Sequence, residues 1–214
     1  QGMVGGLMTQ LHTTVPHRDG QQKFEKASYE KAQALGENVA IVAAKALRGE
    51  KAIKVENPRV SVAVQTIFTP VSGMYGYAIA LGLIHPGWFW GKARTEVNAF
   101  RIGDLEILTI PGELYPEIAE GGIESPDGGD FPGEPIETPP LRKEMKGKVN
   151  MIIGLANDEI GYIVPKTQWD VKPPFAYGET EEPQYGEENS GGPDVAPVIH
   201  KESLAILKRL HALQ

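Results

Sequence analysis

The chain of 214 residues contains no cysteine, which excludes disulfide bonds and thiolate metal sites. It also lacks any block of lysine or arginine, and its formal net charge is −7 at pH 7. That charge balance argues against nucleic acid or an anionic membrane surface as the main partner. A mild acidic excess is instead typical of a protein that remains soluble.

No run of the chain reaches the roughly 18 apolar residues that a membrane-spanning helix needs. The nearest approach, Met74 to Trp90, is interrupted by glycines, His85 and Pro86. The chain opens on the glycine-rich stretch Gln1–Gly6 without a signal peptide, so we expect a processed or partial chain. The length and a hydrophobic content of 41% suit one domain or at most two. With the expected processing, we expect residues 1–214 to be a single domain or a partial domain.

Several familiar catalytic signatures are also missing. There is no Gly-x-Ser-x-Gly, no phosphate-binding Gly-x-x-x-x-Gly-Lys and no dinucleotide fingerprint. The histidines do not have the spacing of a metal motif, and surface or core positions are expected for all of them: His12, His17, His85, His200 and His211.

Hydrophobic periodicity predicts a mixed α/β (α+β) fold, in which a mixed sheet is flanked by helices. Two stretches rich in proline, glycine and acidic residues, 121–147 and 165–193, are predicted as long loops. Tyr75–Ile84 fits a helix or a buried strand, and the aromatic run Trp88–Trp90 fits a core position or a ligand-facing wall. The helices and strands expected from the pattern are helices at Gln21–Leu47 and Asp194–Leu213, strands at Val60–Phe68 and Val149–Ile153, and a hairpin of Thr95–Phe100 with Leu105–Ile110.

Two strand-like runs each end in a turn that carries polar side chains. Leu105–Glu113 stops at Pro111-Gly112 and is predicted to deliver Glu113 to the start of a helix that extends to about Glu120. Val149–Tyr162 has the same form and delivers Asn157 and Tyr162. We interpret the two strand ends as neighbours that line one site. Helix capping remains open as a second interpretation of Glu113.

These segments, in this order, resemble the neutral/alkaline (non-lysosomal) ceramidase family: Gly103–Glu113, Gly154–Ile163, and Tyr185-Gly-Glu with Gly192-Pro193 ahead of a final helix. The resemblance covers most of the chain, but only the rear half of that family's catalytic domain. It implies a zinc ion (Zn2+) held by two histidines, by the glutamate of the Pro-Gly-Glu turn and by a tyrosine. The matching metal ligands are Glu113 and Tyr162.

A further tyrosine of the family acts at the scissile amide. Its best match is Tyr185, with Tyr177 as a competitor, although the loop after Tyr162 is longer than in the family. The chain also departs from the family at Asn157-Asp158-Glu159, where ceramidases usually carry an extra tyrosine. The histidine ligands have no clear counterpart, so the resemblance implies that an upstream half of the same precursor supplies them.

The resemblance implies a zinc-dependent hydrolase of this superfamily, an amidase of lipid metabolism or one that cleaves an amide bond of a small molecule. The alternative is a non-catalytic ceramidase-like subunit, or a ligand- or partner-binding module that uses the long acidic loops. Because ceramidase-like enzymes are commonly exported, a periplasmic or secreted location is expected.

Overall fold

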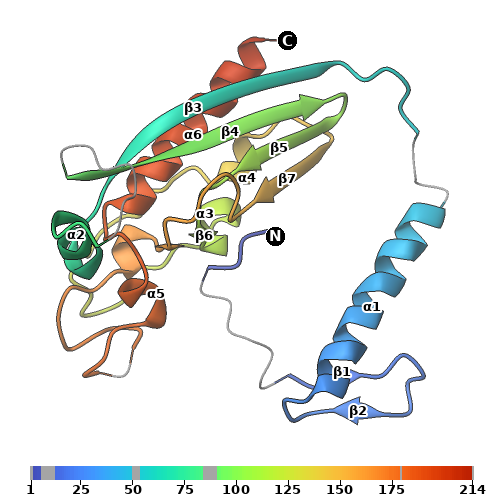
Figure 1. Ribbon diagram of the computed structural model, residues 1–214, viewed down its shortest axis with the longest axis horizontal. Coiled ribbons are helices and arrows are strands. Elements are labelled where there is room, and N and C mark those ends of the chain that lie inside the picture. The colour runs from blue at the N-terminus through green and yellow to red at the C-terminus, as the bar shows by residue number, and fades with distance from the viewer. Residues whose placement is uncertain (1, 6–12, 50–53, 84–90, 179, 214) are drawn as a thin grey trace. The chain divides into compact units, whose positions relative to one another are not determined.

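The computed structural model describes residues 2–5, 13–49, 54–83, 91–178 and 180–213 (Figure 1). The chain divides into a small unit, Leu7–Asn57, and a large unit formed by Gln1–Gly6 and Pro58–Gln214. The large unit contains α2 (Gly73–Ala80), α3 (Pro116–Glu120), α4 (Leu141–Glu144), α5 (Tyr185–Glu188), α6 (Val195–Ala212), η2 (Lys166–Gln168), β3 (Val60–Pro70), β4 (Lys92–Ile102), β5 (Leu105–Thr109), β6 (Glu113–Leu114), β7 (Val149–Ile153) and β8 (Tyr162–Ile163).

The small unit consists of a two-stranded ribbon and one long helix. β1 (Val15–Pro16) pairs with β2 (Lys23–Phe24), and α1 extends over Tyr29–Arg48. The predicted helix Gln21–Leu47 therefore begins too early. Its first residues join the ribbon, and α1 begins where the Ser28 hydroxyl accepts a hydrogen bond of 3.1 Å from the Lys31 amide.

Four strands form the main sheet of the large unit, in the order β3-β4-β5-β7. β3, β4 and β5 are antiparallel neighbours, and the hairpin predicted around Gly103-Asp104 is confirmed as β4 and β5. β7 instead pairs in parallel with β5, so that Thr109 lies opposite Ile153. The sheet is mixed, as predicted, and the α+β class is confirmed.

Helix α6 covers one face of this sheet through contacts with β3 and β4 (Figure 1). The predicted helix Asp194–Leu213 is thereby confirmed, and its apolar stripe forms the centre of the core. The fully buried members of this core include Val97, Ala99, Leu108, Ile199, Leu207 and Leu210. A buried carboxylate, Glu106 on β5, ties the hairpin to the end of α6, because its Oε1 lies 3.0 Å from His211 Nε2.

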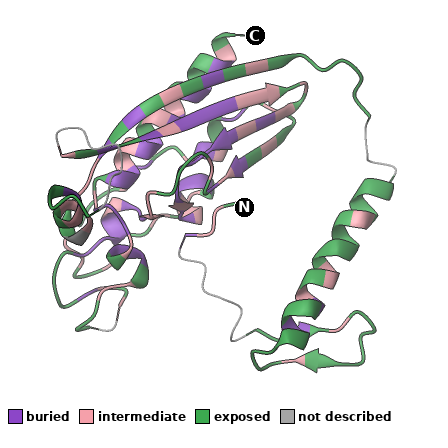
Figure 2. Cartoon of the chain, in the orientation of Figure 1, coloured by how far each residue is buried: buried purple, intermediate pink, exposed green. Residues whose placement is uncertain are grey.

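The opposite face of the sheet carries exposed apolar side chains. Figure 2 shows exposed residues alternating with more buried ones along β3. Strand pairing places them in two rows that cross all four strands, Val60–Ile102–Leu105–Val149 and Val62–Phe100–Ile107–Met151. Val60 and Val149 are 59% and 56% exposed. A contiguous apolar surface of this kind is characteristic of an interaction site.

The remaining predictions have mixed outcomes. The undecided segment after Gly73 is a helix, α2, and residues 121–147 and 165–193 are mostly irregular but contain α4, η2 and α5. Trp88–Trp90 lies outside the described residues. None of the described helices has the length and apolar character needed to cross a membrane.

The packing of α6 yields a stability prediction. Leu207→Ala should lower the free energy of unfolding by about 2–5 kcal/mol, because it leaves a cavity beneath the sheet. Leu213→Ala is the matched control, since Leu213 is 51% exposed, and it should cost about 0.5 kcal/mol or less. Urea denaturation measures both values, and equal losses would contradict the assigned core.

Candidate active site

The parallel pairing of β5 and β7 brings the loops that follow these strands to the same end of the sheet. Residues after β5 and after β7 are then joined by backbone hydrogen bonds. Ala156 N–H donates to the Ile110 carbonyl at 3.1 Å, and Ile160 N–H donates to the Pro111 carbonyl at 2.9 Å. The predicted neighbourhood of the two strand ends is therefore confirmed.

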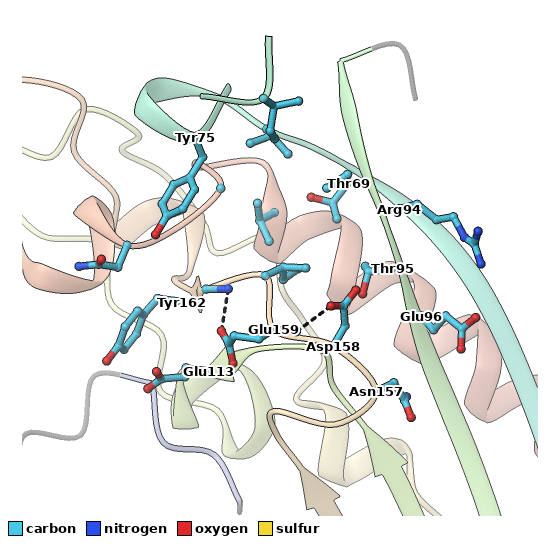
Figure 3. Close-up of a pocket in the computed structure, with 18 of the residues that line it drawn as sticks. Thr69, Tyr75, Arg94, Thr95, Glu96, Glu113, Asn157, Asp158, Glu159 and Tyr162 are labelled. Carbon is cyan, nitrogen blue, oxygen red and sulfur yellow. Dashed lines mark hydrogen bonds between the residues drawn. The ribbon is translucent and has the colours of Figure 1, made fainter. Parts of the chain in front are cut away.

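The same alignment continues into a second, shorter parallel pair. In β6 and β8, Glu113 lies opposite Tyr162, and the Glu113 amide donates a hydrogen bond of 3.0 Å to the Gly161 carbonyl. Figure 3 shows the Glu113 carboxylate beside the Tyr162 hydroxyl. Two residues distant in the chain thus present their oxygens to one position.

Two glycines permit this close approach. A Cβ atom on Gly112 would lie 2.5 Å from the Gly161 carbonyl oxygen, and a Cβ atom on Gly161 would collide with the backbone of Asn189. Gly161 also has a φ of 89°, in the region that favours glycine. Gly112 and Gly161 are therefore required by the packing of these two segments.

The prediction that Glu113 begins a helix is wrong. α3 begins at Pro116, which occupies its first turn, while Glu113 belongs to the short strand β6. Pairing with the Gly161–Tyr162 backbone holds the chain extended at Glu113. Neither helix capping nor a helix N-terminus therefore explains this carboxylate.

The structure brings Tyr185, rather than Tyr177, to these two residues. The Tyr185 ring stands edge-on to the Tyr162 ring, with ring centroids 5.7 Å apart, and its side chain is exposed. Tyr177 instead donates a hydrogen bond of 2.7 Å to Glu124. Gly186 gives room for the hydroxyl of Tyr115, which a Cβ atom at that position would overlap.

Glu113, Tyr162 and Tyr185 line a common pocket of about 830 Å³ (Figure 3). Its walls come from β3, α2, β4, the loop after β7 and the segment around α5. Among the described residues that line the pocket, Arg94 is the one basic side chain, and several others are carboxylates. The other polar lining residues are Thr69, Tyr75, Thr95, Glu96, Asn157, Asp158, Glu159 and Asn189.

Burial and the neighbouring Glu113 carboxylate raise the pKa of Tyr162 to about 12. Burial likewise raises the pKa of Glu159, with the negative charges of Glu113 and Asp158 contributing in the same direction. At neutral pH the Tyr162 phenol therefore keeps its proton. The pocket is an oxygen-rich, acidic environment.

Glu113 and Tyr162 fit a metal centre only as part of its ligand set. Among the residues that the structure describes, no group of three or more His, Asp or Glu side chains could hold a metal ion. The described histidines have other contacts, since His17 pairs with Asp19, His200 with the Pro139 carbonyl and His211 with Glu106. His12 and His85 lie outside the described ranges.

The sequence interpretation missed the pocket residues that precede β5, among them Thr69, Tyr75 and Thr95. They reach the pocket because β3 and β4 continue beyond the end of β5. Nothing in the local pattern of these residues distinguishes them from ordinary strand and helix positions.

Comparison of the chain with protein-family models and with curated proteins finds no match. The ceramidase-like resemblance therefore stays a prediction from the sequence motifs.

The contact between Glu113 and Tyr162 predicts a specific titration. Above pH about 11 the wild-type protein should gain one more tyrosinate than Tyr162→Phe, because the phenol titrates at about 12. Replacing the carboxylate in Glu113→Gln should move this transition to lower pH, since one cause of the raised pKa is removed. Absorbance at the tyrosinate band measures it, and an unchanged midpoint in Glu113→Gln would contradict the contact.

Proposed function

We propose that this chain is part of a zinc-dependent hydrolase of the neutral ceramidase-like superfamily, which cleaves an amide bond of a lipid or a small molecule. The observation that supports the proposal is the direct pairing of Glu113 with Tyr162, with the Tyr185 ring against Tyr162. These are the three residues that the resemblance assigns to the metal and to the amide. They come from three separate segments, so their meeting in one pocket does not follow from their spacing.

Each residue has a separate role in this proposal. Glu113 and Tyr162 contribute one carboxylate and one phenol oxygen to the zinc shell. Zinc, when bound, supplies Lewis acidity to the amide carbonyl and to the attacking water. Tyr185 donates a hydrogen bond to the carbonyl oxygen as negative charge develops on it. The edge-on contact with Tyr162 orients Tyr185 for that donation.

The upstream half of the same precursor is the proposed source of the two histidine ligands. The apolar outer face of the sheet, described above, offers a surface on which further polypeptide can pack. Asn157 connects this face to the pocket, because its side-chain amide donates a hydrogen bond of 3.0 Å to the Thr109 hydroxyl.

Zinc content tests the ligand assignment. A polypeptide that includes the residues preceding Gln1 should bind about one zinc ion, and Glu113→Gln should lower its zinc affinity by tenfold or more. Glu159→Gln is the matched control, because Glu159 lines the same pocket but accepts a hydrogen bond from the Gly161 amide. Elemental analysis after dialysis measures the metal. Unaltered activity of a metal-free Glu113→Ala protein would refute the proposal.

The role of Tyr185 is tested separately from metal binding. Tyr185→Phe should lower kcat for amide hydrolysis by about 10²–10³-fold, as expected for the loss of a donor to a developing oxyanion. Its zinc content should not change. Tyr177→Phe is the control and should retain activity, since Tyr177 bonds Glu124 instead. Equal kcat values for the two variants would remove Tyr185 from the mechanism.

The exposed apolar face of the sheet also favours a second candidate, a non-catalytic subunit that binds a partner protein. In that case a chelator should leave the thermal stability unchanged, and zinc should not copurify. Loss of stability on chelation instead supports the hydrolase.

A further inference from the structure

Strand β4 is more than twice as long as its neighbour β5, and the excess opens onto the pocket. β5 pairs with β4 only from Asn98 to Ile102, whereas β3 pairs with β4 along its whole length from Lys92. The residues Ala93–Glu96 all line the pocket. One side of this stretch of β4 is therefore a free strand edge among the described residues.

The contacts of Asn98 identify which backbone groups lie on this edge. Its N–H donates to the Thr109 hydroxyl at 3.1 Å, and its carbonyl accepts from the same hydroxyl at 3.2 Å. Both backbone groups of Asn98 thus face β5. Because alternate residues of a strand bond to the same neighbour, the N–H and C=O of Glu96 and Arg94 face the same side. There the described part of the chain places no strand opposite them.

A second observation points to a ligand along this edge. Thr95 lies between these residues, is 2% exposed, and its hydroxyl has no hydrogen-bond partner among the described residues. An unpaired polar group at such a depth carries a free-energy cost that a ligand can relieve. The apolar side chains Ile79 and Val195 line the same pocket.

We propose that the pocket binds an extended peptide, which adds to β4 as a further strand through the backbone of Arg94 and Glu96. Free strand edges bind peptides in this way, with main-chain hydrogen bonds providing affinity. A simple hydrocarbon chain has no repeating amide groups and cannot satisfy this edge. The inference rests on the proposed function in one respect, since it names the substrate class as a peptide-like amide.

The experiment uses an uncharged, acetylated pentapeptide of alternating serine and valine as the probe. In nuclear magnetic resonance titrations of this chain, the amides of Arg94 and Glu96 should shift more than that of Thr95, whose backbone bonds β3 opposite Ile67. N-methylation of alternate peptide residues should give two series. One series should bind about tenfold more weakly, and the other should bind like the parent peptide. Equal effects of the two series would overturn the proposal.

A matched pair of variants tests the protein side. Glu96→Pro removes one N–H from the free edge and leaves the ladder with β3 intact, because proline is tolerated at unpaired edge positions. It should weaken peptide binding about tenfold, whereas Glu96→Ala, which keeps the N–H, should bind as the wild type does. Equal binding by the two variants, with circular dichroism confirming that both are folded, would overturn the proposal.

The design separates this inference from the proposed function. Peptide binding is measured without zinc, so its outcome does not depend on the proposed metal site. If the zinc-loaded full polypeptide binds the peptide as an added strand but does not hydrolyse it, the proposed hydrolase is refuted and the peptide-binding edge is not. If the polypeptide hydrolyses amides but binds the two N-methylated series equally, the peptide-binding edge is refuted and the proposed hydrolase is not. A dimer through β4 that the peptide does not dissociate would also overturn it.

Discussion

The parallel pairing of β5 with β7 is the constraint on which the candidate site depends. If the fourth strand were antiparallel, the residues after Ile153 would lie at the opposite end of the strands, away from Glu113. In the observed alignment both strands end side by side, and the crossover between them contains α3 and α4. β6 and β8 then continue the alignment and set Glu113 against Tyr162. Ligands commonly bind at the carboxyl ends of parallel strands for this geometric reason.

The long acidic loops are held by their own carboxylates. Asp170 accepts hydrogen bonds from the amides of Asp130 and Ala176, and Asp130 accepts one from the amide of Val171. Glu187 accepts from the amides of Asp170 and Gln184, and the latter bond fixes the start of α5. The acidic residues of the predicted loops therefore satisfy backbone groups of these loops. Through α5 this network positions Tyr185.

Local patterns predicted the strands, the hairpin and the neighbourhood of Glu113 and Tyr162, because alternation, Gly103-Asp104 and Pro111-Gly112 act over short distances. These local patterns failed where two positions were equally suited to begin a helix. Pro111 and Pro116 can each begin a helix, and pairing with Gly161, far along the chain, decides for Pro116. Thr95 was missed because its role also depends on residues far from it in the chain. Its place in the pocket depends on where β5 ends, which its own neighbours in sequence do not encode.

The protonation state of Tyr162 bears on the proposed zinc site, to which this chain would contribute two oxygen ligands. Burial and the adjacent carboxylate raise the pKa of Tyr162 to about 12, so a cation that binds through the phenolate must release that proton. Two oxygen ligands, one of which first has to lose a proton, provide limited affinity at neutral pH. Neutral imidazoles bind zinc strongly without such a cost, since histidine has an ordinary pKa of about 6.5. In the proposed zinc site, histidines from further polypeptide would therefore contribute most of the affinity, and Glu113 with Tyr162 would determine where the metal lies.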